Sequence, residues 1–566
     1  MSAISPRPAA VPLRPPVGSR RRASLLEVLS STDHKRIGLL TMVTAFGFFL
    51  VAGALALTMR AELQKPGLQF LSENTYNELF TMHGSTMFYL FAVPVVLGVG
   101  LYFVPLQLGA ARVLWPRLAL GGYWLFLAGG LIMYAGFLTQ SGAASFGWTA
   151  YFPLSDQNAT PGTGADFWVI GVALATTGAL LQSISLLGTL VRLRAPGMTM
   201  LRMPLFSWSQ LVTVFMVITG FPVLIVAMTL LEMDRQGASI FSSSPEGSVT
   251  WQHLFWFYGH PVVYVVFFPL VGVVGETIAT FSRRRFFGFR TTVVSLLLFS
   301  AISMSVWGHH MFATNQVSNR YFSLTSTILL VPAGIEYFGF LATMAGGRIR
   351  FASPMLFAIG FVLLFLIGGL TGIMVASPPL DYHVHDTYFV VAHFHYTLFG
   401  GTVFGLFAAI HYWFPKVTGR LLDEGWAKAT FVLLFLGALV TFIPMFFLGS
   451  EGMTRRIADY LPLRDWSTLN TISTIGAFTI FLGILAFLVN VMRSLRLGAP
   501  AGPDPWEGQT LEWASASPPP RHNFGALPPV RSHTPLLDLR EVGRDPLREV
   551  GLEPRQAAGD LAEAAP

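Results

Sequence analysis

The sequence predicts an all-α, polytopic membrane protein with about twelve transmembrane helices. Hydrophobic residues make up 53% of its 566 residues and charged residues only 11%, whereas soluble domains carry about 25% charged residues. About twelve apolar runs are long enough to cross a bilayer, which takes roughly 20 residues in a helix. The chain has no cysteine, which excludes disulfides, thiolate-bound zinc and iron–sulfur clusters.

The predicted spans follow one another with polar loops between them. In chain order they cover residues 37–58, 79–107, 118–140, 166–191, 207–231, 253–280, 291–313, 324–345, 354–376, 388–413, 429–449 and 470–493. We expect a basic N-terminal segment (1–30), a twelve-helix domain (31–496) and a Pro-rich tail (497–566). The tail is charged and poor in apolar residues, so we expect it to be extended and partly disordered.

Positive charges gather in every second loop. Examples are Arg112 and Arg117 after the second predicted span and the arginines at 283–285 after the sixth, whereas the intervening loops hold few positives and several acids. Positively charged loops face the cytoplasm, so an even number of spans places both termini there. The formal net charge of +7 is therefore better explained by orientation in lipid than by nucleic-acid binding.

Six histidines fall inside or at the edge of these spans, all in the predicted outer third of the membrane. They are His83, His260, His309, His310, His393 and His395. An ionisable side chain in a span is costly and usually functional, and imidazole is a common ligand of iron, copper and zinc. One such histidine alone is more often a headgroup-level or capping residue. Six at one depth on four helices predict a buried metal and haem site.

The spacing of these histidines suggests two metal centres. His393 and His395 are two residues apart on a helix, so they point to opposite sides of it. His309 and His310 are adjacent at the end of a span, where they can still converge on one metal. We therefore expect centres on both sides of the tenth span.

Short strings around these histidines resemble one known family. They are Thr32-Asp-His-Lys35, Met82-His83-Gly84, Trp251-Gln-His-Leu-Phe-Trp256, His260-Pro-Val-Val-Tyr264, Trp307-Gly-His-His-Met311 and His385-Asp-Thr-Tyr-Phe-Val-Val-Ala-His-Phe-His395. Together they resemble subunit I of the haem–copper oxidases, in the A-type cytochrome c oxidase branch, and matches run from about residue 30 to 524. The resemblance implies a bacterial inner-membrane enzyme that reduces O2 to water.

The resemblance also implies a role for each histidine. His83 and His395 would be the axial ligands of a low-spin haem, of type a. His393 would be the proximal ligand of a high-spin haem, of type a3. His260, His309 and His310 would hold copper B facing that iron. Tyr264 lies one helical turn after His260, and in the family this tyrosine is joined covalently to the histidine and supplies an electron and a proton.

Further residues and partners carry over in the same way. His385 and Asp386 resemble the family's Mg²⁺ site near the haem propionates, and Arg455 and Arg456 match its outer arginine pair. Arg60 resembles an arginine beside the low-spin haem. The resemblance implies a copper A-bearing subunit II, a subunit III and cytochrome c as electron donor.

The proton channels of the family are altered in this chain. One family channel uses an Asn, an Asp and a Glu, where this sequence has Leu101, Arg112 and Val262. Leucine and valine cannot relay a proton, and arginine stays protonated. The second channel uses a Thr and a Lys, where this sequence has Ala333 and Glu336. We therefore expect reduced or rerouted proton pumping.

Glu336 is the one acid that the sequence places deep within a span. Desolvation disfavours the charged form of such a carboxylate, which makes it suitable either as a structural hydrogen-bonding group or as a proton carrier. Our hypothesis is that Glu336 replaces the lysine as proton donor towards Tyr264.

Several alternatives stay open at this point. A quinol oxidase subunit I would share the same histidines with another electron donor. A nitric oxide reductase-like enzyme also shares them, but Tyr264 and Val262 argue against it. A non-catalytic haem-bound relative would explain the altered channels, although the complete ligand set argues against it. A transporter has the least support, because no inverted repeat is evident.

Overall fold

The computed structural model describes residues 24–462 and 465–553. Within these residues the regular elements are all helices, which confirms the predicted all-α fold. The chain divides into two compact units, Met1–Ser31 and Thr32–Pro566. In the first unit the described part is the short helix α1 (Leu25–Leu29), which begins after a capping box made by Ser24 and Glu27. Most of the predicted N-terminal segment 1–30 lies outside the described residues.

Twelve helical segments of the second unit are long and apolar enough to cross a membrane, which confirms the predicted number. Spans made of one helix are α2 (His34–Glu62), α6 (Thr163–Arg192), α8 (Gly247–Phe281), α12 (Ser353–Val375), α16 (Glu424–Ser450) and α17 (Trp466–Leu497). The other spans contain two or three helical segments. They are α3, η1 and α4 (Glu73–Ser85, Thr86–Ala92, Val93–Leu108), α5 and η2 (Pro116–Ala135, Gly136–Leu138), and α7 and η4 (Leu205–Met233, Asp234–Ala238). The remaining three are α9 and η5 (Phe289–Ser303, Trp307–Thr314), α10 and α11 (Asn319–Ile328, Leu330–Ala345), and α14, η6 and α15 (Tyr388–His395, Tyr396–Val403, Phe404–Thr418). Short helices in the connections and the tail are η3 (Met200–Arg202), α13 (Pro378–Val384), η7 (Leu511–Ala514), α18 (Pro535–Glu541) and α19 (Pro546–Glu549).

Polar caps fix where several spans begin. The Asp33 side chain accepts from the Lys35 backbone N–H at the start of α2, and Thr387 accepts from the Phe389 N–H at the start of α14. These caps satisfy N–H groups that lack a partner within the helix. The α14 cap fixes the start of the short helix whose last turn carries His393 and His395.

Glycines let α5 and α6 pack with their backbones in close contact. A Cβ atom at Gly129 would lie 2.5 Å from the Gly171 carbonyl oxygen, and one at Gly171 would lie 2.6 Å from the Gly129 oxygen. Gly122 and Gly178 face each other in the same way. Small residues at facing positions are typical of helix pairs in membranes, where close van der Waals packing drives association.

Two spans switch from α- to π-helix immediately after a histidine pair or a single histidine. The π-helical segment η1 (Thr86–Ala92) follows His83 by three residues, and η6 (Tyr396–Val403) follows His395 directly. π-Helical turns are rare and occur frequently at functional sites. Each of these spans therefore continues beyond its histidines in a shifted helical register.

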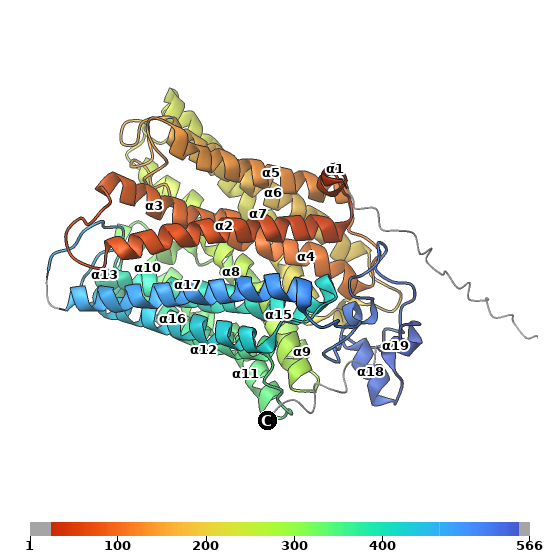
Figure 1. Cartoon of the computed structure of the whole chain (residues 1–566). Coiled ribbons are helices and arrows are strands. Elements are labelled where there is room, and N and C mark those ends of the chain that lie inside the picture. Colours follow the sequence, from red (N-terminus) through yellow and green to blue (C-terminus); the bar gives the residue numbers. More distant parts are fainter. Residues whose placement is uncertain (1–23, 463–464, 554–566) are drawn as a thin grey trace, which may run out of the picture. The chain divides into compact units, whose positions relative to one another are not determined.

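The described part of the tail, residues 497–553, is folded, in contrast to the extended chain that its composition suggested. Leu511, Trp513 and Leu536 are almost fully buried, and the Trp513 indole N–H donates to the Tyr412 hydroxyl at 2.9 Å. Figure 1 shows α18 and α19 beyond one end of the long helices of the second unit. The prediction of an extended tail was wrong because a few large apolar side chains, spaced among prolines, are sufficient to dock the tail on the end of α15.

Candidate metal and haem centre

Three histidine side chains converge between α8 and η5. His260, His309 and His310 each offer one ring nitrogen, and these nitrogens all lie within 4.8 Å of one another. His260 Nδ1 lies 3.2 Å and His309 Nε2 lies 3.1 Å from His310 Nε2. The structure thus brings together the three histidines that the sequence assigned to one metal. Three imidazoles at this spacing suit a borderline transition metal such as copper or zinc.

Neighbouring side chains hold this group in place. His309 Nδ1 lies 2.8 Å from the Ser326 hydroxyl on α10. The His310 ring stacks on Trp256 with ring centroids 3.8 Å apart. Such outer contacts orient the rings that bind a metal. Ser326 was missed at the sequence level, because nothing in its local sequence signals a contact with η5.

Tyr264 packs against His260, as their spacing of one helical turn predicts. The two ring centroids are 4.7 Å apart. His260 Nε2 is buried and has no hydrogen-bond partner among the described residues. One nitrogen of His260 therefore faces the metal group while the other remains free for a second contact.

His393 and His395 point to different neighbours, in keeping with their spacing of two residues along the helix. His393 Nδ1 lies 3.0 Å from the Gly368 carbonyl oxygen and 3.2 Å from the Thr371 hydroxyl, both on α12. His395 Nδ1 lies 2.8 Å from the Val391 carbonyl oxygen, and its ring stacks on Phe442 of α16. The contacts of His393 with α12 could not be predicted from local sequence patterns, because they join separate helices.

His83 on α3 completes the second centre. Its Nδ1 lies 2.9 Å from the Ala52 carbonyl oxygen, and its charge would interact with that of His395. His393 in turn interacts electrostatically with His260 and His309. The six histidines thus form two groups, with His83 and His395 on one side of α14 and His393 facing the three-histidine cluster on the other.

The residues present fit haem and copper. In His83, His393 and His395 a backbone carbonyl engages Nδ1, which leaves Nε2 as the metal-binding atom. All three rings lie deep in the bundle and still keep accessible surface. An internal space therefore adjoins each ring, as a planar cofactor requires.

Arg60 on α2 is buried beside the second centre. Its Nη2 donates to the carbonyl and side-chain oxygens of Asn470 at 3.1 and 2.9 Å. Its Nε and Nη1 have no partner among the described residues. A buried guanidinium with two unused donors calls for a polar acceptor, which the edge of a haem can supply.

The predicted outer arginine pair lies beside Asp386. Arg455 Nε donates to Asp386 Oδ1 at 2.7 Å. Arg456 lies over the Phe80 ring, and its guanidinium makes no hydrogen bond among the described residues. Burial, together with the Arg455 charge, lowers the pKa of Arg456 to about 10. An anionic group such as a propionate would compensate this buried cation.

His385 and Asp386 are neighbours, with 3.7 Å between His385 Nε2 and Asp386 Oδ2. The Asp381 carboxylate, 3.4 Å from His385 Nδ1, favours the protonated imidazole and raises the pKa of His385. Burial alone would raise the pKa of Asp386, but the Arg455 charge outweighs it and the pKa is lowered. In the described residues these two side chains are not part of a cluster of three candidate ligands.

Glu336 lies inside the bundle on α11, as predicted, and is only 2% exposed. Its Oε1 has no partner among the described residues, and it interacts electrostatically with Tyr264. At the altered channel positions, Leu101 and Val262 are fully buried among apolar groups and Arg112 is exposed. The family's usual route through these positions is therefore apolar here.

A further buried acid, Glu276, lies near the end of α8 and has no role in the sequence-based assignment. The carboxylate is buried and accepts hydrogen bonds from Gln107 Nε2 at 2.7 Å and from the Phe206 backbone N–H at 2.8 Å. These partners lie on two other spans, α4 and α7. No local sequence pattern predicts such contacts.

The chain is similar to a protein family and to several known proteins. Residues 36–479 match the family described as cytochrome c and quinol oxidase polypeptide I. The chain is 47% identical to a probable cytochrome c oxidase subunit 1-alpha of Streptomyces avermitilis, over 95% of this chain and 94% of that protein. It is 49% identical to a probable subunit 1-beta of Nocardia farcinica, with 94% and 92% covered. A haem–copper terminal oxidase dimer solved by cryo-electron microscopy shares the fold, with a TM-score of 0.70, 18% identity and coverage of 83% and 85%.

Proposed function

Since the chain belongs to the cytochrome c and quinol oxidase polypeptide I family, we propose a role for each buried polar residue of its two centres. The chain is subunit 1 of a cytochrome c oxidase, the catalytic subunit of a haem–copper enzyme that reduces O2 to water. Haem iron and copper supply electron transfer and oxygen activation when bound. The protein contributes ligands, orientation and protons.

His393 and the three-histidine cluster form the oxygen-reducing centre in this proposal. The observation that carries it is the arrangement of His260, His309 and His310 within 4.8 Å of one another, facing His393. His393 would hold one haem next to the copper that the three-histidine cluster would hold, and this pair would supply the chemistry of O2 reduction. His83 and His395 would hold the other haem, which would supply electrons.

Tyr264 donates a proton and an electron to oxygen in this scheme. Its ring lies against His260, whose Nε2 is unpartnered, and this geometry supports the covalent link implied by the family. The same arrangement disfavours a nitric oxide reductase-like enzyme, because Val262 offers no carboxylate beside the copper ligands.

Glu336 supplies protons towards Tyr264. It is buried, lacks a partner at Oε1 and interacts with Tyr264. Glu336→Gln is expected to slow proton-coupled turnover while both haem spectra are retained, and Glu336→Asp should restore part of the rate. Full turnover in Glu336→Gln would rule out this role.

Arg60, Arg455 and Arg456 bind polar edges of the haems. The unused donors of Arg60 and the buried charge of Arg456 support this assignment. His385 and Asp386 offer two ligands for Mg²⁺, with further ligands from a partner subunit or water. Haems of types a and a3 follow from the A-type resemblance.

The proposed complex includes a copper A-bearing subunit II and a subunit III, with cytochrome c as donor. The chain lies in a bacterial inner membrane with both termini in the cytoplasm, as the positively charged loops indicate. Residues 1–30, 31–496 and 497–566 serve as N-terminal segment, catalytic domain and cytoplasmic tail.

Oxygen consumption by the purified complex tests the function. We expect rapid uptake with reduced cytochrome c, slow uptake with quinol, and one copper retained by this subunit for every two haems. Rapid uptake with quinol alone would favour the quinol oxidase alternative. Bound haem without oxygen uptake from either donor would favour a non-catalytic relative.

A further inference from the structure

Two carboxylates are buried together at the inner end of α8. Gln107 Nε2 lies 2.7 Å from Glu276 Oε2 and 3.3 Å from Glu512 Oε1, so one amide group donates to both. The indole N–H of Trp413 also donates to Glu512 Oε1, at 3.3 Å. Glu276 is 8% exposed and Glu512 is fully buried. The pair joins a membrane span to the tail helix η7.

The surrounding charges compensate one carboxylate but not both. Lys416 on α15 is buried and interacts electrostatically with Glu512. Tyr412 also faces both carboxylates and carries no positive charge. Asp504 interacts with Lys416 as well, so the Lys416 charge is shared between Asp504 and Glu512. Burial raises the pKa of Glu512, although its hydrogen bonds oppose this shift. Two like charges in a low-dielectric interior repel strongly, so this arrangement favours one proton shared by the two carboxylates.

A small cavity lies between Glu276 and the tail. Its lining includes Glu276, Gln509, Thr510, His533 and Thr534. Gln509 is 5% exposed, and its side-chain oxygen has no partner among the described residues. A buried acceptor of this kind is normally satisfied by water or another donor. The cavity thus brings Gln509 and Thr510 of the tail next to Glu276, although most of its wall is apolar.

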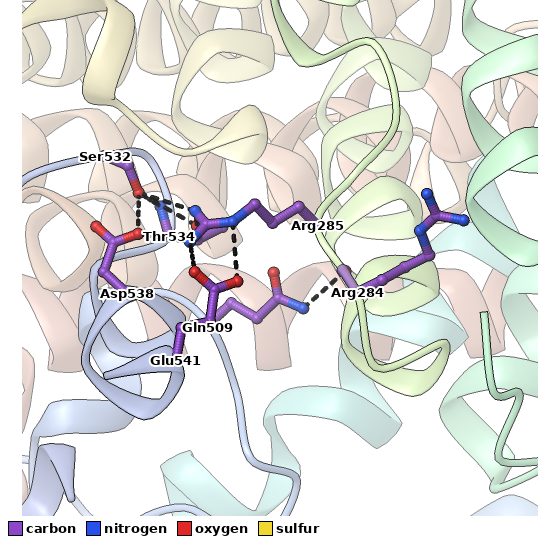
Figure 2. A network of polar contacts seen from close by, with 7 residues as sticks. All are labelled: Arg284, Arg285, Gln509, Ser532, Thr534, Asp538 and Glu541. Atoms are coloured by element: carbon purple, nitrogen blue, oxygen red, sulfur yellow. Dashed lines mark hydrogen bonds and ion pairs between the residues drawn. The ribbon is translucent and has the colours of Figure 1, made fainter. Parts of the chain in front are cut away.

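The tail forms part of the wall of this cavity, and Arg285 holds the tail against the loop after α8. Arg285, in the loop after α8, donates to Thr534 at 2.5 Å, to Asp538 at 2.8 Å and to Glu541 at 2.5 Å. Gln509 Nε2 donates to the Arg284 carbonyl oxygen at 3.0 Å. Figure 2 shows these side chains gathered around the Arg285 guanidinium. The anchor keeps the tail residues of the cavity next to α8.

On its other side the pair adjoins a polar stripe that runs along α7 into the bundle. The Ser207 hydroxyl donates to Gln107 Oε1 at 2.9 Å. Gln210 and Thr213 follow at helical spacing on the same face, and all three side chains are fully buried. Gln210 Oε1 and Thr213 Oγ1 have no partner among the described residues. The stripe rises about 9 Å from Ser207 to Thr213, at 1.5 Å per residue.

We propose that Glu276 and Glu512 form a proton-collecting site that takes protons from the cytoplasmic side through the tail cavity and releases them along the α7 stripe. This inference rests on the proposed oxidase function, which consumes protons at the centre near Tyr264. One proton enters the pair for each proton that leaves it, and no electrons are exchanged. The site supplies an inward route that avoids Leu101 and Val262.

The test uses the whole complex in sealed vesicles, with reduced cytochrome c outside and only the internal pH varied. In the wild type, oxygen uptake should fall as internal pH rises. Glu276→Gln and Glu512→Gln should each lower turnover by about tenfold, less than the loss of a group at the reacting atoms, and should weaken the dependence on internal pH. Glu276→Asp, which keeps a carboxyl group, should recover most of the rate.

A matched control is Glu424→Gln, since Glu424 accepts from Ser353 on the same side of the membrane but lies outside the pair. Its turnover should equal that of the wild type. Infrared spectroscopy of the resting enzyme offers a readout independent of turnover, because a protonated carboxyl band should disappear in Glu276→Gln.

Two results would overturn the proposal. One is wild-type turnover and wild-type dependence on internal pH in both glutamine variants. The other is an unchanged carboxyl band in both variants, in samples whose haem spectra show intact folding. A wild-type complex without oxygen uptake from any donor would instead contradict the oxidase function, so the two failures are distinguishable.

Discussion

At its outer end α8 carries His260, and at its inner end it carries Glu276. His260 presents Nδ1 to the other two histidines of the cluster, 3.2 Å from His310 Nε2, whereas both oxygens of Glu276 accept hydrogen bonds. A metal ligand must keep a lone pair available, and its neighbours therefore fix the ring without engaging that atom. A group that gains and loses a proton needs partners that tolerate both states, and an amide shared with a second carboxylate meets this need.

The largest effect is expected from a variant that disrupts the three-histidine cluster. His260→Asn removes one of the three copper ligands, so copper should be lost while the low-spin haem keeps its spectrum. Turnover should fall by about a thousandfold or more, because metal ions contribute several kcal/mol to catalysis. Copper content and oxygen uptake of the purified complex measure the two effects.

His411→Asn is the matched control for that variant. His411 is equally buried on α15, and its Nδ1 lies 2.7 Å from the Phe407 carbonyl oxygen, but it lies outside both centres. Copper and haem contents should be unchanged. If His411→Asn also loses copper, the loss in His260→Asn would reflect a disturbed fold and not the removal of a copper ligand.

A smaller effect is expected from Arg60→Met, which removes the unused donors beside the low-spin haem. The absorption band of that haem should shift, and turnover should fall by about tenfold, which corresponds to the loss of one hydrogen bond to a charged group. Copper content should stay the same. An unshifted band would indicate that Arg60 only joins α2 to Asn470 of α17.

The variant Thr371→Val tests the contacts that orient the His393 ring. The variant removes one of two acceptors near His393 Nδ1, and the Gly368 carbonyl remains. Because outer contacts of metal-bound histidines typically change affinity or activity by 10–100-fold, we expect a loss of about tenfold or less. Thr177→Val on α6, where the hydroxyl bonds only its own helix at Ala173, should leave activity unchanged.

The smallest effect concerns the tail at the inner end. Burial lowers the pKa of His533 from 6.5 to about 4, and its ring stacks on Phe289. As pH falls from about 6.5 towards 4, the undocked tail takes up a proton that the docked tail resists, so docking weakens. Limited proteolysis of residues 499–553 should therefore speed up across this range.

His533→Phe keeps the stacking and removes the titration. Proteolysis of this variant should be insensitive to pH between about 6.5 and 4. The same acceleration in His533→Phe would assign the pH dependence to Asp538, Glu541 or other acids of the tail.

Much of the outer site could be predicted because its signal is local. An imidazole in an apolar run stands out wherever its partners lie, and the neighbouring residues of His260, His309 and His393 carry recognisable strings. The inner site could not be predicted in this way. Gln107 and Glu512 are 405 residues apart in sequence, and the tail composition concealed the buried Leu511 and Trp513.

The fold shows the same division. The number of spans followed from apolar length, which the membrane imposes on each segment separately. Changes of helix type did not, because a π-helical turn such as η1 or η6 depends on how neighbouring helices pack around it. Sequence patterns therefore located the helices but not the places where their register shifts.

The π-helical segments η1 and η6 have a consequence for how the chain tolerates insertions and deletions. Each π-turn accommodates an extra residue within a continuous helix. Removal of a single residue from 86–92 or 396–403 would allow an ordinary α-helix to form there without displacing His83, His393 or His395. Relatives that differ in length by one residue are therefore expected to differ at these two segments, while insertions elsewhere in the same spans would rotate the histidines away from their metals.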